Sequence, residues 1–330
     1  MIPLLALRLH YRTKRPITLP AFPGSTWRSA LGYRLRTASC VTGAKRCDGC
    51  MAAPHCAYGQ LFETPTTAAL SAAASQAACE TNPGTREGLL QAYPKAPHPF
   101  VLSALSGGGT YRAGDSLVVE LILLAPALRW LPTLLPVLRT LQIHRSDLQL
   151  EAITQIDLHA PKAPGEPLAP QYLLAMQELE CPEPPPAPSG QLGIELLHPL
   201  RLRRNNHYVG AEQFDFGAFI ATLLRRASML STLTSQDPVA DFPALTKLGQ
   251  SVSLANAELR WFDWHRHSAR QRQKIPMGGL LGHFQLTALP EPIWPWVWLG
   301  QWLHVGKGAV MGMGRYQLKQ DLTDLQRYTP

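Results

Sequence analysis

The order of the periodic segments in the second half of the chain is the feature that most restricts its fold. Four segments alternate apolar and polar residues as strands do, and two place apolar residues at helical spacing. In chain order they are a strand at 191–198, a helix at 214–233, strands at 252–264 and 278–289, a helix at 292–304 and a strand at 310–318. This order is that of a ferredoxin-like unit, so we predict an α+β domain.

The first half of the chain repeats this order. It contains a strand at 4–11, a helix at 25–39 after a Ser/Thr cap, strands at 98–105 and 117–124, a helix at 127–141 that includes Pro132 and Pro136, and a strand at 148–158. The chain is therefore predicted to form two tandem ferredoxin-like domains, the architecture that RRM-like RNA-binding modules also use.

The predicted domains occupy residues 1–181 and 191–330. A proline-rich linker at 182–190 joins them, and an Ala-rich stretch at 64–88 is predicted to be a surface loop of the first domain. The apolar stretch at 117–138 contains charged residues and three prolines, and the N-terminus lacks the features of a signal peptide. We therefore expect a cytoplasmic protein without membrane association.

Four cysteines lie close together between the first predicted helix and the second predicted strand. They are Cys40, Cys47, Cys50 and Cys56, and the middle two form a CxxC pair. Four thiolates at this spacing can surround Zn²⁺, so we predict a structural zinc site within a cysteine-rich knuckle at 40–56. An iron–sulfur cluster and unligated thiols are the alternatives, and His55 could replace Cys56 as a ligand.

A glycine-rich loop at 306–314 separates the last predicted helix from the last strand. Its glycines, Gly306, Gly308, Gly312 and Gly314, are interleaved with Lys307 and followed by Arg315. Glycine tolerates positive φ and can turn consecutive N–H groups toward an anion, while the cations neutralise charge. The run therefore predicts a phosphate-binding loop, with a flexible turn as the alternative. Because Lys307 is followed by glycine, the loop is not a nucleotide P-loop.

Two further basic clusters in the second half have the chemistry to bind a phosphate backbone. The net charge of +8 already favours a polyanionic partner. The segment 265–274 is predicted to form a β-hairpin. This hairpin either binds the phosphate backbone or only exposes its tip to solvent. The predicted phosphate ligands of the two clusters are Arg201, Arg203, Arg204, Arg266, Ser268, Arg270, Gln271 and Lys274. The nearby aromatic residues Tyr208, Trp261 and Trp264 could stack unpaired bases, with packing in the core as the alternative for the two tryptophans.

Several of these motifs occur together in one known family. They are residues 23–32 (PGSTWRSALG), the knuckle followed by 61–64 (LFET), 198–204 (HPLRLRR), the two tryptophans before 268–271 (SARQ), 278–282 (GGLLG) and the glycine-rich loop. In combination they resemble the CRISPR-associated precursor-crRNA processing endoribonucleases of the RAMP superfamily. The resemblance covers nearly the whole chain except the Ala-rich stretch.

The resemblance implies binding of CRISPR repeat RNA and its metal-independent cleavage. In that reaction the 2′-hydroxyl attacks the adjacent phosphate and leaves a 2′,3′-cyclic phosphate and a 5′-hydroxyl, so no cofactor serves catalysis. The expected partners are repeat RNA or crRNA and other subunits of a CRISPR effector complex. The alternative is a non-catalytic RAMP subunit that binds the crRNA handle within such a complex.

The catalytic candidates follow from the need for proton transfer near neutral pH, which histidine performs well. Many members of the family place a histidine in or just after the first helix, whereas this chain has Tyr33 there and no histidine before His55 in that region. The candidates are therefore Tyr33, His267 and His304, of which Tyr33 could instead be a half-buried helix aromatic. His304 could instead brace the glycine-rich loop.

Overall fold

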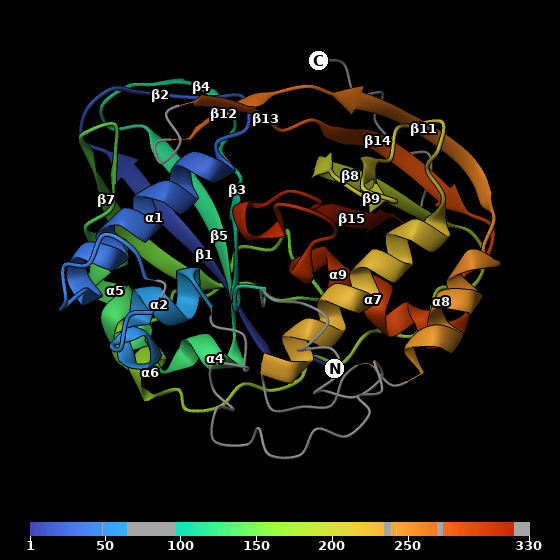
Figure 1. The fold of residues 1–330 in the computed structure, drawn as a ribbon, viewed down its shortest axis with the longest axis horizontal. Coiled ribbons are helices and arrows are strands. Elements are labelled where there is room, and N and C mark those ends of the chain that lie inside the picture. Colours follow the sequence, from blue (N-terminus) through green and yellow to red (C-terminus); the bar gives the residue numbers. More distant parts are fainter. Residues whose placement is uncertain (48, 65–96, 234–238, 240, 269–272, 320–330) are drawn as a thin grey trace. The chain divides into compact units, whose positions relative to one another are not determined.

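The chain folds into two compact units. The computed structural model describes residues 1–47, 49–64, 97–233, 239, 241–268 and 273–319 (Figure 1). The N-terminal unit comprises Ile2–Pro182 and Ser228–Ala240, and the C-terminal unit comprises Met1, Glu183–Ala227 and Asp241–Pro330. Most of the predicted Ala-rich loop lies outside the described residues.

A five-stranded antiparallel sheet forms the centre of the N-terminal unit. Its strands are β1 (Leu4–Thr13), β3 (Phe100–Ala104), β5 (Ser116–Leu124), β6 (Gln142–Ile143) and β7 (Ser146–Gln155). Their order is β3-β5-β1-β7-β6. The first and last long strands are neighbours, and the four long strands are close to the predicted ranges. This order is compatible with ferredoxin-like folds.

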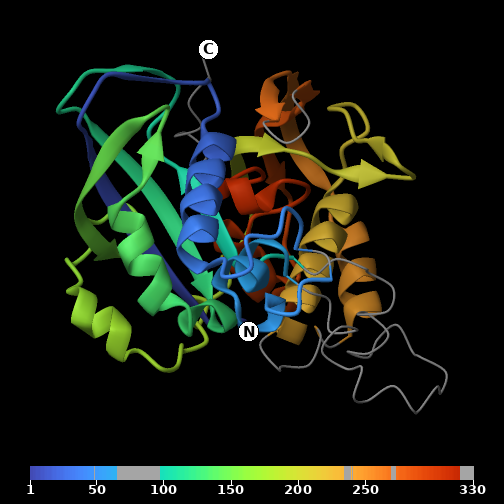
Figure 2. The ribbon, with the colours of Figure 1, turned by 60° about the vertical axis from the view of Figure 1, so that its left-hand side comes forward.

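Helices cover one face of this sheet, as Figure 2 shows for α1 (Gly24–Ser39) and α5 (Leu131–Arg139). Trp27, Leu31 and Leu35 recur every fourth residue of α1 and are fully buried, so α1 packs through a single apolar stripe. The predicted Ser/Thr cap is wrong, because α1 begins after Pro23 and has no side-chain cap hydrogen bond.

The predicted helix at 127–141 is two helices, α4 (Ala125–Leu128) and α5. Pro132 lies in the first turn of α5, where its missing N–H leaves no helical hydrogen bond unmade, and this placement favours a new helix start. Smaller elements of the unit are β2 (Ile17–Leu19) paired with β4 (Gly109–Tyr111), η1 (Ala53–His55), α2 (Ala57–Phe62) and α6 (Pro170–Ala175).

The C-terminal unit has a four-stranded antiparallel sheet of the same order. Its strands are β8 (Leu192–Leu200), β11 (Leu254–Phe262), β14 (Gly279–Leu286) and β15 (Tyr316–Lys319), arranged β11-β14-β8-β15. The helix α7 (Phe216–Leu233) follows β8 in the chain and belongs to this unit up to Ala227, and α9 (Trp294–Leu303) follows β14. The ring of Phe219 on α7 lies edge-on to Phe284 and Tyr316 of the sheet, with centroids 5.6 and 5.3 Å away. These contacts form the core of the unit.

The C-terminal unit also contains two hairpins and short helices. β9 (Arg203–Arg204) pairs with β10 (His207–Tyr208), and β12 (His265–Ser268) pairs with β13 (Gln273–Pro276). The second pair confirms the predicted hairpin at 265–274. The short helices are α8 (Phe242–Gln250), which the periodicity did not predict, η2 (Glu291–Ile293) and η3 (Ala309–Met311). Among the described helices, none combines the length and apolar composition that crossing a membrane requires.

Candidate nucleic-acid interface

The glycine-rich loop lies against the end of β8. The backbone of Gly306 has φ +86°, and a Cβ atom there would lie 2.5 Å from the carbonyl oxygen of Arg201. Gly314 has φ +68°, and a Cβ atom there would overlap the carbonyl oxygen of Val305. Glycine is therefore required at both positions, because a side chain at 306 would push the loop away from Arg201 at the end of β8 and one at 314 would push apart the two ends of the loop. The loop is a packed turn, in which the 3-10 helix η3 replaces the first part of the predicted strand at 310–318.

The loop's N–H groups are arranged differently from the prediction. The N–H of Lys307 donates to the carbonyl oxygen of Arg201 and that of Gly314 to Pro199, each at 2.9 Å, while the N–H of Met313 donates to Gly308 at 3.3 Å. These donors are used inside the protein, so the prediction that consecutive N–H groups face an anion is wrong for them. The exposed side chain of Lys307 provides a cation on the glycine-rich loop.

The predicted arginine cluster divides into a buried and an exposed part. The guanidinium of Arg201 lies 4.0 Å from the ring centroid of Tyr208 and donates to the carbonyl oxygen of Pro276 at 3.2 Å. Arg201 is nearly buried and braces the base of the β12–β13 hairpin. Arg203 and Arg204 are exposed on β9, where Arg204 forms an ion pair with Asp215. The exposed side chains of Arg203 and Arg204 can therefore contact a phosphate more readily than that of Arg201.

Tyr208 forms an aromatic platform beside these arginines. Its side chain is 43% exposed, Arg203 lies 5.4 Å from its ring centroid, and the ring of Trp261 lies 6.4 Å away. An exposed aromatic ring between cations is suited to stacking an unpaired base. Trp264, in contrast, is buried and serves the core.

Three segments that are distant in the sequence thus meet within the C-terminal unit. The glycine-rich loop joins the arginine segment through Lys307, and Arg201 joins that segment to the end of β13 through Pro276. In the hairpin, Arg266 is half-buried and stands opposite Ile275. The side chains of the predicted ligands His267, Ser268 and Lys274, and all of Arg270 and Gln271, lie outside the described residues.

One buried and one half-buried histidine lie beside the glycine-rich loop. His304 is 2% exposed, and burial holds the pKa of its imidazole well below the usual range, with Arg315 and His198 adding to this effect. His198 donates through Nδ1 to the carbonyl oxygen of Gly312 at 2.8 Å, and burial, helped by Arg315, lowers its pKa to about 4. Both imidazoles are neutral near pH 7. The predicted catalytic role of His304 is not favoured, because proton transfer to RNA needs a side chain at the surface.

The N-terminal unit presents Tyr33 at its surface. The side chain of Tyr33 is 69% exposed on α1, so the alternative of a half-buried helix aromatic is wrong. A phenol in this position is accessible to a ligand.

Sequence reasoning missed His98, which lies beside α1 in space. Its Nε2 is 3.2 Å from a guanidinium nitrogen of Arg28 on α1, and its Nδ1 is 3.0 Å from the hydroxyl of Thr64. The side chain is half-buried. Seventy positions separate His98 from Arg28 in the chain, and no local pattern links them, so only the tertiary structure reveals this histidine next to the first helix.

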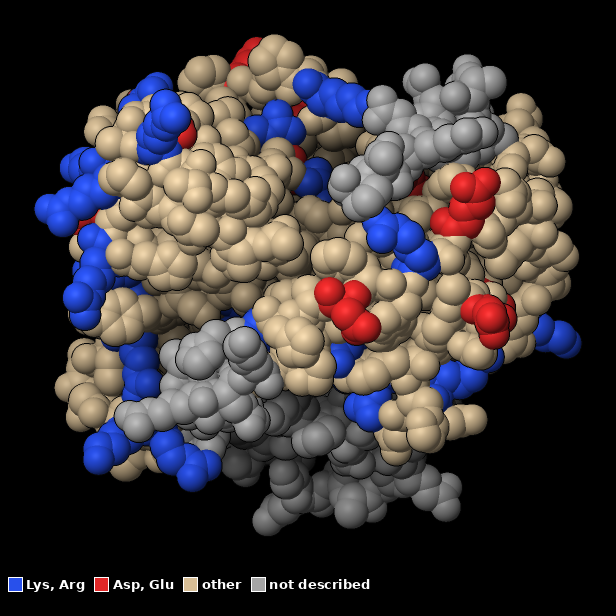
Figure 3. All heavy atoms as spheres, turned by 90° about the horizontal axis from the view of Figure 1, so that it is seen from above, with Lys and Arg blue, Asp and Glu red and all other residues tan. Residues whose placement is uncertain are grey.

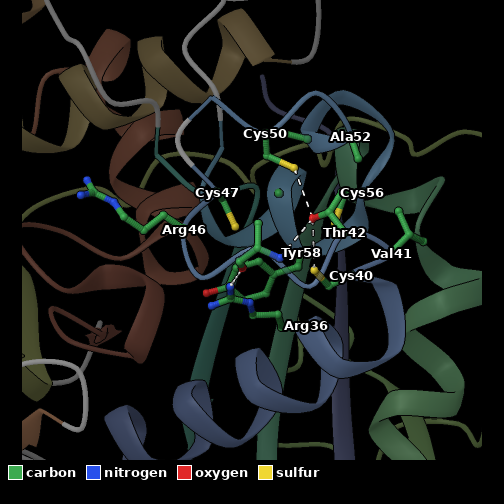
Figure 4. A pocket seen from close by; sticks show the side chains of 13 residues that line it. Arg36, Cys40, Val41, Thr42, Arg46, Cys47, Cys50, Ala52, Cys56 and Tyr58 are labelled. Carbon is green, nitrogen blue, oxygen red and sulfur yellow. Dashed lines mark hydrogen bonds between the residues drawn. The ribbon is translucent and has the colours of Figure 1, made fainter.

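The four knuckle cysteines line one pocket of the N-terminal unit, which Figure 4 shows. Cys40 follows α1 directly and Cys56 directly precedes α2. His55 is exposed and does not line this pocket. In the part of the chain that the structure describes, no three His, Cys, Asp or Glu side chains are already gathered closely enough to hold a metal ion.

The charge distribution agrees with a polyanionic ligand. On the face shown in Figure 3, Lys and Arg side chains are widely spread and Asp and Glu side chains are few. The whole chain has a formal net charge of +8. Such a surface attracts a nucleic acid through long-range electrostatics.

Two protein-family models match separate parts of the chain. Residues 194–316 match the family described as CRISPR-associated endoribonuclease Cas6, a range that includes the arginine segment and the glycine-rich loop. Residues 2–162 match a family described as an N-terminal domain. A comparison with curated proteins found no match.

Solved structures share the fold at low sequence identity. A partial Cas6-RT-Cas1–Cas2 complex is similar with a TM-score of 0.53 and 14% identity, over 98% of this chain and 47% of that chain. A Cas6 product complex has a TM-score of 0.53 and 16% identity, over 96% and 100% of the two chains. Cas6 of Thermus thermophilus has a TM-score of 0.51 and 15% identity, over 97% and 99%. The chain spans half or less of the two Cas6-RT-Cas1 chains that it matches.

Proposed function

We propose that this chain is a CRISPR-associated protein of the Cas6 type, which binds CRISPR repeat RNA and cleaves precursor crRNA as an endoribonuclease. The observation that carries this proposal is the junction of the glycine-rich loop with the arginine segment, where the N–H of Lys307 bonds to Arg201. This junction places the exposed cations Lys307, Arg203 and Arg204 within one unit of the protein. It lies inside the region that matches the family.

The RNA is proposed to bind the C-terminal unit through its backbone and one base. Lys307, Arg203 and Arg204 neutralise phosphates, and the exposed face of Tyr208 stacks an unpaired base. The β12–β13 hairpin adds further contacts through the ligands predicted for it, from Arg266 to Lys274. We also propose that the two units are tandem ferredoxin-like domains, as their matching strand orders suggest.

The proposed chemistry needs no metal ion. The 2′-hydroxyl of the RNA attacks the adjacent phosphate, the 5′-oxygen leaves, and the products carry a 2′,3′-cyclic phosphate and a 5′-hydroxyl. The protein must accept the proton of the 2′-hydroxyl, donate one to the leaving oxygen and stabilise the phosphorane. We propose Tyr33, His267 and His98 as the proton-transfer candidates, with Arg28 beside His98 as a cation. His304 is assigned the positioning of the glycine-rich loop.

Other CRISPR proteins are proposed as partners of the RNA-bound chain. The similar chain of the Cas6-RT-Cas1–Cas2 complex occurs in such an assembly. The burial of His304 favours the second candidate function, a RAMP subunit that binds the crRNA handle without cutting it. Such a subunit would keep the exposed cations and need no surface histidine.

An RNA cleavage assay in EDTA separates these functions. The purified protein is incubated briefly with its cognate repeat RNA, with the same RNA carrying a 2′-deoxy sugar at the scissile site, and with a scrambled RNA. Cleavage of the first RNA alone, with a cyclic-phosphate end, supports the endoribonuclease. Tight binding of intact repeat RNA supports the non-catalytic subunit. Cleavage only after addition of a divalent metal contradicts the proposed mechanism.

A further inference from the structure

We propose that Cys40, Cys47, Cys50 and Cys56 bind one Zn²⁺ ion as a four-thiolate site that ties the end of α1 to the start of α2. Nothing in this proposal depends on RNA cleavage, because a zinc ion with four protein ligands has no open position for water or substrate. The site is structural, and it belongs to the N-terminal unit.

The backbone presents the four cysteines from three fixed places around one pocket (Figure 4). The N–H of Cys40 donates to the carbonyl oxygen of Arg36 in the last turn of α1 at 2.9 Å, and the carbonyl oxygen of Cys56 accepts from Gln60 of α2 at 2.9 Å. Cys47 and Cys50 share a tight turn in which the N–H of Cys50 donates to Cys47 at 3.1 Å. Such CxxC turns are typical of zinc knuckles.

Two of the four thiols approach the same hydroxyl group. The hydroxyl oxygen of Thr42 lies 3.8 Å from Sγ of Cys40 and 3.7 Å from Sγ of Cys50, so these two thiols face each other across it. The thiol of Cys56 donates to the carbonyl oxygen of Ser39 at 3.7 Å. These three sulfurs are therefore held by weak hydrogen bonds. Zinc binding would replace these contacts, because each sulfur of a four-thiolate zinc site lies about 2.3 Å from the ion.

Charge and hydrogen bonding around the pocket suit thiolates. Arg36 and Arg46 line the pocket, and the guanidinium of Arg36 is fixed by a 2.5 Å hydrogen bond to the carbonyl oxygen of Ala44. The hydroxyl of Thr42, which accepts from the N–H of Ala44 at 3.4 Å, lies 3.8 Å from the sulfur of Cys40. Four thiolates around Zn²⁺ carry a net negative charge, which these cations and donors stabilise.

The segment between Cys40 and Cys56 lacks a hydrophobic core of its own. None of its described residues is buried, and its most apolar long side chain, Met51, is 94% exposed. A segment of this kind gains almost no stability from apolar burial, so its compact turn needs another source of order. A tetrahedral metal site supplies that order, and it explains why four cysteines occur here.

Metal content and cobalt substitution test the site in the full-length protein. We expect one equivalent of zinc in the wild type and, after exchange for Co²⁺, the absorption bands of a tetrahedral thiolate site. The variant Cys50→Ser should lose at least about tenfold in zinc affinity in competition with a chromogenic chelator, since one of four ligands is gone. The matched control Cys181→Ser removes an exposed cysteine outside the pocket and should bind zinc as the wild type does.

A second measurement covers the case in which Cys50→Ser does not fold. Zinc added back to metal-free wild-type protein should raise its melting temperature and protect the knuckle from proteolysis. Three results would overturn the proposal: no metal bound by the wild type in either experiment, equal zinc affinity in Cys50→Ser and the control, or the visible absorption of an iron–sulfur cluster in protein purified without oxygen.

Discussion

The backbone N–H of Lys307 donates a 2.9 Å hydrogen bond to the carbonyl oxygen of Arg201. This bond joins the glycine-rich loop to the arginine segment, which the sequence presents as two separate basic motifs. Gly306 permits the contact, because a side chain at that position would strike the Arg201 carbonyl. The exposed Lys307 side chain is thereby held in the same unit as Arg203 and Arg204.

Replacing Lys307 by Ala should weaken RNA binding without changing protein stability. The side chain is exposed, so the free energy of unfolding should change by less than about 0.5 kcal/mol. Loss of one phosphate contact should reduce the slope of log affinity against log salt concentration by about 1. Filter binding across a salt series measures this slope. Lys247→Ala, which removes an exposed lysine of α8, should keep the wild-type slope, and equal slopes for both variants would contradict the assignment.

Replacing Gly314 by Ala should destabilise the C-terminal unit by about 2 kcal/mol or more. The new methyl group would overlap the carbonyl oxygen of Val305, and the left-handed backbone adds strain. The midpoint of urea unfolding reports the change. Gly107→Ala is the matched control, because a Cβ atom there meets no neighbouring atom within 4 Å. A Gly314→Ala variant as stable as this control would show that the loop does not pack as described.

The stability of the protein should fall as the pH drops below the ordinary histidine pKa. Burial lowers the pKa of His198 from 6.5 to about 4. Between these values the unfolded chain binds a proton that the folded chain does not. The contribution of His198 is therefore fully present above pH 6.5 and is lost as the pH falls toward 4, by up to about 3 kcal/mol. Burial lowers the pKa of His304 as well, so it acts in the same direction.

The variant His198→Asn isolates this effect. Its amide can donate to the carbonyl oxygen of Gly312 in place of Nδ1, but it does not titrate. The dependence of the unfolding free energy on pH, measured by urea denaturation, should become shallower in the variant. A pH profile as steep as that of the wild type would show that His198 is not the neutral, half-buried group described above.

Replacing His98 by Ala should slow RNA cleavage more than it weakens RNA binding. General acid–base groups contribute about a hundredfold or more to the rate, so single-turnover cleavage should fall by at least that factor while the dissociation constant stays nearly constant. His144→Asn is the control, since it removes an exposed imidazole of the same unit and suits the left-handed backbone at that position. Wild-type cleavage by His98→Ala would exclude a role for His98 in proton transfer.

The periodic patterns located most of the fold. The strands that became β1, β5, β8, β11 and β14 were predicted within a few residues, because β5 is a short apolar run and the others alternate apolar and polar side chains over part of their length. The predicted elements differ from the structure where a proline or glycine interrupts an otherwise periodic segment. Pro132 divided a predicted helix in two, and η3 took residues that alternate as a strand does, because the glycines on either side of it adopt left-handed conformations.

The candidate site was predicted only as a set of residue types. Arg201 and Arg203 look equivalent in the sequence, but Arg201 is packed over Tyr208 and against Pro276 while Arg203 is exposed. His304 looks like a surface group beside a loop and is buried. The sequence predicts no role for His98, because its neighbours Arg28 and Thr64 come from distant parts of the chain.

The sequence by itself determined the order of strands and helices, the position of the glycine-rich loop and the grouping of four cysteines, because periodicity and spacing are local properties. The tertiary structure alone decided which arginines are exposed to solvent, which histidines are desolvated by burial and which histidine lies beside α1. Those properties depend on desolvation and on hydrogen-bond partners from distant segments, and packing fixes both.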